Sequence, residues 1–186
     1  ANNNVSTTTA VVTVIDNISP TAVAQNISVN LNATGTASIT ASQVNNGSSD
    51  ACGVTLSVSP STFTCANVGA NTVTLTVTDA NGNTSTTTAI VTVNDVTTPS
   101  AIAQNITVNL DNTGNATISA SQVNNASSDA CGIATLAVSP STFTCANVGA
   151  NTVTLTVTDV NNNVSTATAT VTVVDNTAPT ALAQNI

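Results

Sequence analysis

Residues 151–158 read NTVTLTVT, and this short stretch indicates the fold class of the whole chain. Val153, Leu155 and Val157 alternate with threonines, and a period of two places apolar and polar side chains on opposite faces of a β-strand. Threonine suits the solvent-facing side because it is β-branched and carries a hydroxyl group. The same pattern spans 71–78. Both stretches therefore predict strands with one buried face.

Turn signals separate these strands from other alternating stretches. An Asn-rich turn follows each, DANGN at 79–83 and DVNNN at 159–163, and such residues tolerate the positive φ of a hairpin turn. The other strands predicted in this half of the chain are 106–110, 116–120, 133–138, a short one around Phe143, and 165–174. About seven strands per copy and no helical periodicity predict an all-β chain of β-sandwich domains.

The chain is built from repeats. The segment TAVAQNISVN starts at Thr21, SAIAQNITVN at Ser100 and TALAQNI at Thr180. We therefore expect two complete sandwich domains, 17–95 and 96–175. Residues 1–16 are interpreted as the C-terminal strand of a preceding repeat, and 176–186 as the start of a following one. We expect Phe63 and Phe143, the only aromatic residues, to be the largest side chains in the two cores.

Four cysteines recur with the repeat, Cys52 and Cys65 in the first copy and Cys131 and Cys145 in the second. Three pairings are possible. We expect one disulfide within each copy, because each domain is then self-sufficient. Closing a loop of about 14 residues contributes roughly 3 kcal/mol. The alternative is zinc binding, but two cysteines without histidine are a poor ligand set. Disulfides in turn predict an oxidising, extracellular location.

The composition excludes several functions. The chain has no Lys, Arg or His and carries eight acidic residues, all Asp, for a net charge of −8. Binding of nucleic acid or of an anionic membrane surface is not expected, because both require basic side chains. No apolar run is long enough for membrane insertion. General acid–base catalysis has no His, Lys, Arg, Glu or Tyr to use, so we do not expect an enzyme or an organic cofactor.

Three motifs resemble a known family of extracellular modules. CANVGANTVTLTVTDANGN at 65–83, SSDACG at 48–53 and DNTAP at 175–179 are similar to hyalin-repeat (HYR-like) domains, which are immunoglobulin-like. The amino-acid sequence of the whole repeat also resembles tandem repeats of very large surface adhesins of Bacteroidetes. These include gliding-motility adhesins of the SprB kind, which the type IX system secretes. The resemblance implies a cell-surface or filament protein and names no ligand.

Two groups of oxygen-bearing residues are candidate calcium ligands. The first is the alternating pattern in each hairpin turn: Asp79, Asn81 and Asn83, and Asp159, Asn161 and Asn163. The second lies at the predicted junctions: Asp16, Asp95 and Asp175, with Asp50 and Asp129 from a neighbouring loop. Asx-stabilised turns and solvated aspartates are the alternative interpretations of the same residues.

Two functions remain in competition. The first is a structural spacer that extends a distal binding region from the cell, with neighbouring repeats of the same chain, or other copies in a filament, as its partners. The second is a low-affinity carbohydrate- or surface-binding module that gains strength from repetition. The absence of Trp and Tyr counts against a sugar platform.

Overall fold

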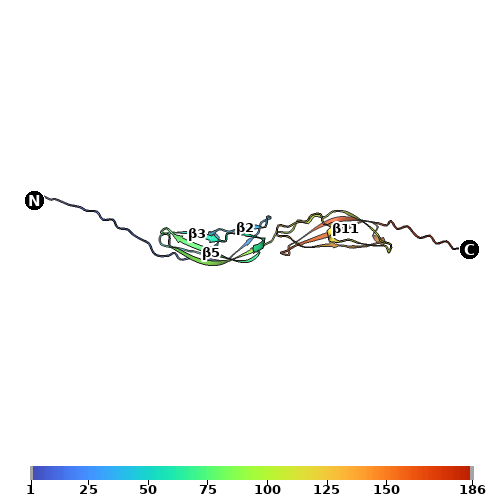
Figure 1. Cartoon of the computed structure of the whole chain (residues 1–186), viewed down its shortest axis with the longest axis horizontal. Helices are drawn as coiled ribbons and strands as arrows, with labels where there is room; N and C mark the ends of the chain where they lie inside the picture. Colours follow the sequence, from blue (N-terminus) through green and yellow to red (C-terminus); the bar gives the residue numbers. More distant parts are fainter. Residues whose placement is uncertain (1, 185–186) are drawn as a thin grey trace. The chain divides into compact units, whose positions relative to one another are not determined.

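A computed structural model describes residues Asn2–Gln184 and confirms the all-β, immunoglobulin-like sandwich fold (Figure 1). The chain divides into two compact units. The first comprises Ala1–Val29, Ser38–Thr62 and Gly69–Thr92; the second comprises Asn30–Ala37, Phe63–Val68 and Val93–Ile186. The second unit therefore includes two short segments from the first repeat.

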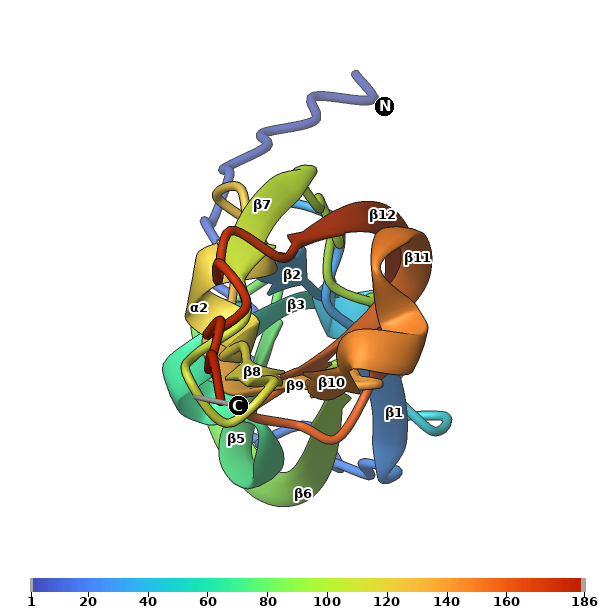
Figure 2. The same cartoon turned by 90° about the vertical axis from the view of Figure 1, so that its right-hand side faces the viewer.

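The second repeat contains a four-stranded and a two-stranded sheet. The larger sheet has the order β7-β12-β11-β9, formed by Ile106–Asn109, Val164–Val174, Gly149–Asp159 and Ile133–Ser139. β11 and β12 form the predicted antiparallel hairpin, and β7 joins β12 in parallel (Figure 2). The smaller sheet pairs β10, Thr142–Thr144, with β8, Asn115–Thr117.

The first repeat has the same topology. Its larger sheet has the order β1-β6-β5-β3, formed by Ile27–Asn30, Thr84–Asn94, Gly69–Asp79 and Val54–Ser59. Its smaller sheet pairs β2, Thr36–Ser38, with β4, Thr62–Thr64. The tandem repetition read from the sequence is thus a repetition of sheet order as well.

Short helices interrupt the predicted strand pattern. α1 spans Ala41–Val44 and α2 spans Ala120–Val123, and the 3₁₀ turns η1 and η2 span Cys65–Asn67 and Cys145–Asn147. The strand expected over 116–120 therefore ends at Thr117. At the start of α2 the Gln122 side chain accepts a hydrogen bond from Ser119 N at 2.8 Å, which satisfies a donor at the helix start.

Six strands per repeat are found among the described residues, where about seven were expected. The start of each repeat forms isolated bridges, Thr21↔Ser49 and Ala24↔Asn45 in the first repeat and Ser100↔Ser128 and Ala103↔Asn124 in the second. Each repeat therefore opens on a loosely paired segment and enters its main sheet only at β1 or β7.

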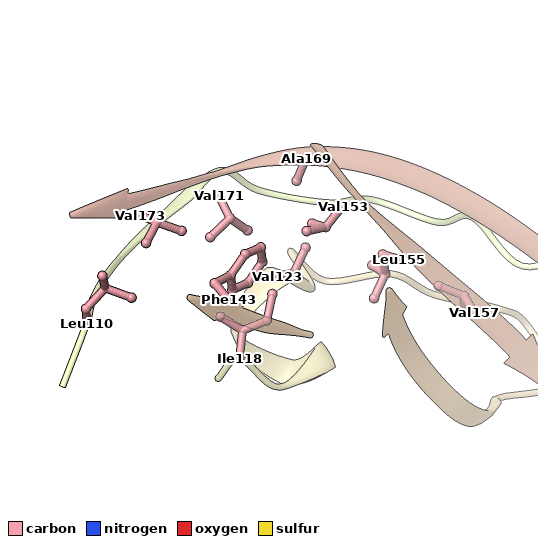
Figure 3. Close-up of a cluster of buried hydrophobic side chains, with 10 residues drawn as sticks. All are labelled: Leu110, Ile118, Val123, Phe143, Val153, Leu155, Val157, Ala169, Val171 and Val173. Carbon is pink, nitrogen blue, oxygen red and sulfur yellow. The ribbon is translucent and has the colours of Figure 1, made fainter. Parts of the chain in front are cut away.

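The core of the second repeat surrounds Phe143, as predicted. Phe143 is 2% exposed and lies among Ile118, Val123 and Val171 (Figure 3). Alternate residues of β11 and β12 supply the rest of the core, and the threonines between them face away. In the first repeat Phe63 is buried to the same degree, at 1% exposed. A phenylalanine is thus the largest buried side chain in both copies.

Residues 2–20 form no strand. Val12 and Val14 are 82% and 90% exposed, although their counterparts in β6, Val91 and Val93, are 0% and 1% exposed. The apolar pattern of a last strand is therefore present without sheet partners, and the boundaries at 16, 95 and 175 remain predictions. Among the described residues, no helix is long and apolar enough to cross a membrane.

Candidate functional site at the loops beside the disulfide

The cysteines form one disulfide, between Cys65 and Cys131, whose Cα atoms are 5.2 Å apart. Cys52 and Cys145 are free and exposed. The predicted pairs Cys52–Cys65 and Cys131–Cys145 are therefore wrong. The bond joins one cysteine of each repeat, and it lies within the second compact unit, which includes Phe63–Val68.

The second repeat shows why its own two cysteines do not pair. Cys131 lies beside the hairpin turn that connects β11 to β12, because Val160 N donates to the carbonyl of the adjacent Gly132 at 3.2 Å. Cys145 lies beside a different turn, where its Sγ is 3.6 Å from Gly114 O. The two cysteines are thus anchored to separate turns of the same domain.

These turns stand at opposite ends of a long strand. The Gly114 turn follows Leu110, whose N–H donates to the carbonyl of Val174 at the last residue of β12. The hairpin turn immediately precedes the first residue of β12. A strand of 11 residues is roughly 35 Å long. A disulfide requires Cα atoms within about 7 Å, so a bond within the repeat is excluded by its own sheet.

An acidic cluster surrounds Cys52 in the first unit. One ligand atom each from Asp16, Asp50 and Cys52 lie within 4.8 Å of one another. Asp50 Oδ1 accepts a hydrogen bond from Cys52 N at 2.8 Å. The hydrogen bond from the thiol to Asp16, together with the charge of that carboxylate, raises the pKa of Cys52 above its ordinary value of 9.0. Cys52 is thus held in its thiol form beside two carboxylates.

The matching cluster in the second unit is Asp95, Asp129 and Cys131. Asp129 Oδ1 accepts from Cys131 N at 2.7 Å, and Asp95 Oδ1 accepts from Thr97 N at 3.0 Å. Asp95 is only 8% exposed, and its Oδ2 is buried without a hydrogen-bond partner. A buried carboxylate oxygen without a donor is costly unless a cation or proton compensates it. The disulfide leaves the Cys131 sulfur unavailable as a thiolate ligand.

The predicted D-x-N-x-N stretches are Asx-stabilised turns. Asp79 Oδ1 accepts from Asn81 N and Asn83 N, both at 2.8 Å, and Asn83 Nδ2 donates to Asp79 Oδ2 at 2.7 Å. Burial alone would raise the pKa of Asp79, but these donors outweigh it and lower the pKa below 3.8. Asp159 has the same contacts with Asn161 and Asn163. The turn carboxylates are therefore occupied by N–H donors.

One asparagine in each turn links the two groups of candidate residues that the sequence suggested separately. Asn83 Nδ2 donates to Asp16 O at 3.0 Å, and Asn163 Nδ2 donates to Asp95 O at 3.2 Å. Each hairpin turn is thereby tied to the aspartate that ends the preceding repeat. Asn161 Oδ1 is a second buried oxygen without a partner in the second unit. Asp175 is exposed, and its Oδ1 accepts from Thr177 N at 2.9 Å.

The chemistry available to this site is that of oxygen ligands and thiols. The whole sequence contains no basic side chain, so no ion pair with Lys or Arg can neutralise the carboxylates. Hard divalent cations such as calcium prefer carboxylate and amide oxygens. In the second unit, the buried oxygens without a hydrogen-bond partner include Asp95 Oδ2 in the acidic cluster and Asn161 Oδ1 in the hairpin turn.

No protein-family model matches the chain, and no curated protein is similar to it. Among solved structures it is similar to human mucin-like protocadherin EC1-2, with 16% identity over 84% of this chain and 98% of that chain, at a TM-score of 0.41. It is also similar to human protocadherin-24 EC1-2, with 13% identity over 86% of this chain and 100% of that chain, at a TM-score of 0.43. A third similar structure is that of Sidekick-1 immunoglobulin domains 1–4, with 12% identity over 84% of this chain and 51% of that chain, at a TM-score of 0.25. These identities and scores are low, so the proposals below rest on the chain's own contacts.

Proposed function

We propose that this chain is a series of structural spacer domains from a large extracellular adhesin or surface filament. The observation that carries the proposal is the disulfide between Cys65 and Cys131, which joins one repeat covalently to the next. A bond between successive repeats restrains their separation, whereas a bond within one repeat would stabilise only that repeat. Covalent joints of this kind suit a part that transmits force along an array.

The surface of the larger sheet also suits a spacer. Threonines face each other across the hairpin on the side away from the core, as in Thr154↔Thr168 and Thr156↔Thr166. Hydroxyl groups keep this face hydrated without charge. A strand of 11 residues adds roughly 35 Å of reach per repeat. Copies with the same surface are sufficient for a spacer, because it needs no unique binding site.

The location and parent protein belong to the same proposal. A disulfide indicates an oxidising compartment, and we place the chain outside the cell. The resemblance of its repeats to gliding adhesins of the SprB kind supports a surface protein of Bacteroidetes exported by the type IX system. No catalytic role is included, because the sequence has no His, Lys, Arg, Glu or Tyr to transfer protons.

Small-angle scattering tests the spacer role. Chains lengthened by one and by two further copies of residues 96–175 should gain roughly 35 Å in maximum dimension for each copy. A glycan array and adsorption to solid surfaces test the competing function with the same proteins. Binding that strengthens with repeat number would support a multivalent binding module and replace the spacer proposal. A maximum dimension that does not grow with repeat number would also contradict it.

A second role, calcium binding at the junction, is favoured by one observation. Asp95 Oδ2 is buried and unpartnered beside Asp129, in a chain that has no basic residue. We propose that these two carboxylates bind calcium together with oxygens of the Asp159 turn and stiffen the junction. This site is independent of the thiols, because Cys131 is oxidised.

Thermal unfolding with calcium and with chelator tests this second role. Calcium should raise the unfolding midpoint of the unaltered chain, and Asp95→Asn should remove the increase. Asp175→Asn is the matched control, because Asp175 has the same place in the repeat and is exposed. An identical midpoint in calcium and in chelator would end the calcium proposal and leave the spacer role untouched.

A further inference from the structure

The two free cysteines each have a bonded counterpart in the other repeat. Cys145 corresponds to Cys65, and Cys52 corresponds to Cys131. Each free thiol therefore occupies the position that forms the inter-repeat disulfide elsewhere in the same chain. Local geometry shows whether the free cysteines also share the conformation of the bonded ones.

Cys145 is held in the same way as the bonded Cys65. Cys65 Sγ lies 3.7 Å from Gly35 O, and Cys145 Sγ lies 3.6 Å from Gly114 O. A Cβ atom added to either glycine would be 2.6 Å from the neighbouring sulfur, so both turns need glycine to make room for it. Both cysteines also begin a 3₁₀ turn of three residues. The Cys145 side chain is preorganised for a disulfide.

Cys52 matches the bonded Cys131 in the same detail. The backbone N–H of each donates to the aspartate two residues earlier, at 2.8 Å for Cys52 and 2.7 Å for Cys131. The glycine after each has a positive φ, +86° at Gly53 and +102° at Gly132. Its N–H donates to the carbonyl of that aspartate at 3.3 Å in both loops. The SSDACG loop thus keeps one shape with and without its bond.

A groove beside Cys145 leaves space for such a loop. It measures ≈ 440 Å³ and is lined mainly by the turn at 111–114 and by linker residues between Asp175 and Pro179. At the corresponding place in the first repeat, Ala33, Thr97 and Thr98 line a cavity whose other wall is Ser128, Asp129 and Ala130. There the Ser-Ser-Asp-Ala-Cys-Gly loop of the second repeat is already in position.

The linker that follows the second repeat has the shape needed to repeat this arrangement. Thr177 N donates to Asp175 Oδ1 at 2.9 Å, and Thr97 N donates to Asp95 Oδ1 at 3.0 Å. The linkers that leave the two repeats thus begin with the same Asx turn. A third copy entering after Asp175 would meet Cys145 as the second copy meets Cys65.

We propose that Cys145 forms a disulfide with the SSDACG cysteine of a following repeat, and Cys52 with the CANVG cysteine of a preceding one. The occupant of the groove is thus a further copy of this repeat in the same chain, and the bond would recur at every junction. The inference rests on the proposed spacer array and specifies how its domains are joined.

The chemistry requires a disulfide-bearing oxidant, either a small disulfide or a thiol oxidoreductase. One thiolate attacks the oxidant's disulfide and forms a mixed disulfide, releasing one thiol. The second cysteine thiolate displaces the other thiol, so two protein thiols are oxidised and one disulfide is reduced. Two protons and two electrons pass to the oxidant.

Peptide mapping of a lengthened chain tests the proposal. A further copy of residues 96–175 is inserted after Asp175, and the oxidised protein is alkylated and cleaved before aspartates without reduction. In the unaltered chain both cysteines of a repeat fall in one peptide, 50–78 or 129–158. The disulfide between repeats joins these two peptides. In the lengthened chain we expect all three cysteine peptides in one linked species, with two alkylated thiols in the intact protein.

Matched variants separate the possible outcomes. Cys145→Ser in the lengthened chain should release the added peptide and leave Cys65 linked to Cys131, whereas Cys52→Ser should change no linkage. Four free thiols in the unsubstituted lengthened chain, a bond within one repeat, or a dimer joined through Cys145 would overturn the proposal. Scattering on the same protein reports the spacer role separately, so loss of the bond and loss of extension are distinguishable.

Discussion

The two complete repeats differ in the bonding and burial of junction residues that are identical in their sequences. Cys52 is a free thiol, whereas Cys131, in the same loop conformation, is bonded. Asp16 is half-buried, whereas Asp95 is 8% exposed with one unpartnered oxygen. The corresponding junction residues of the two repeats thus differ in bonding and in burial, although their types are the same.

The cores show the opposite behaviour. Val44 and Val123 are both 0% exposed, and Phe63 and Phe143 differ by only one percentage point. The burial of the core residues is thus the same in the two repeats. Comparing the two copies separates the cores, which are alike, from the junction residues, which differ.

The largest expected effect concerns the shared cores. Phe143→Ala should lower the free energy of unfolding of its repeat by roughly 3–5 kcal/mol, because it leaves a cavity at the centre of the sandwich. Phe63→Ala should cost the first repeat the same amount. Unfolding in denaturant, monitored in each repeat by hydrogen exchange, measures both losses of stability. A large difference between the two variants would show that the cores are not equivalent.

The next effect should differ between the copies. Cys131→Ser removes a bond that closes 66 residues of chain, and the chain-entropy relation gives a loss of about 4 kcal/mol. Cys52→Ser changes the equivalent residue, which is free, and should have almost no effect. Denaturant unfolding under non-reducing conditions compares the two variants. Equal losses would mean that Cys52 is also bonded, which contradicts the assigned pairing.

The sequence was sufficient for the sandwich because alternation reports directly on burial. Val153, Leu155 and Val157 are all 0% exposed, as their spacing predicted. The hairpin turns could also be predicted from the sequence, since Gly82 and Asn162 adopt the expected positive φ of +92° and +70°. Helix α2 was missed because four residues give no periodicity, although the Ser-x-x-Gln pattern at 119–122 was a usable signal.

The disulfide pairing failed for a topological reason. A separation of 13 or 14 residues suggests a closed loop only if the chain reverses between the cysteines. The residues from 132 to 144 contain two strands, β9 and β10, and no Asn-Gly or similar hairpin turn. The intervening chain therefore traverses the domain. The absence of a reversing turn was the available signal, and the identity of the bonded partner needed the contacts between loops.

A smaller effect is expected at the turn tied to the junction. Asp159→Ala removes the acceptor of three N–H groups, from Asn161 N, Asn163 N and Asn163 Nδ2. Leaving these buried or half-buried donors unpaired should cost roughly 1–3 kcal/mol. The control is Asp175→Ala, because the exposed Asp175 accepts from Thr177 N and should contribute much less. Equal destabilisation by both variants would contradict a special role for the Asp159 turn.

The turn at 111–115 allows a comparison between an aspartate and its natural asparagine counterpart. Asp111 Oδ1 accepts from Thr113 Oγ1, Asn115 N and Thr113 N, and these bonds lower its pKa below 3.8. Asn32 makes the same contacts with Thr34 and Thr36 in the first repeat. Asp111→Asn should therefore keep these contacts at pH 7 and lose only the extra strength that the carboxylate charge gives them.

The effect of pH follows from the direction of that shift. A lowered pKa in the folded state stabilises the protein above the unfolded pKa, and this contribution disappears as pH falls through the folded pKa. Below about pH 4 the unaltered chain should lose stability at this turn, whereas Asp111→Asn should not. Unfolding measured between about pH 2 and 6 checks this difference. Identical pH profiles would show that the Asp111 hydrogen bonds do not favour its ionised form.

The smallest expected effect is on the reactivity of Cys52. The hydrogen bond and charge of Asp16 raise the pKa of this thiol above 9.0, so little thiolate is present at neutral pH. Asp16→Asn should lower the pKa and increase the alkylation rate of Cys52 near pH 8 several-fold. Cys145 in the same molecule is an internal reference and should react at an unchanged rate. If the ratio of the two rates stays the same in Asp16→Asn, the carboxylate does not control the thiol. The comparison between the copies would then rest on the disulfide alone.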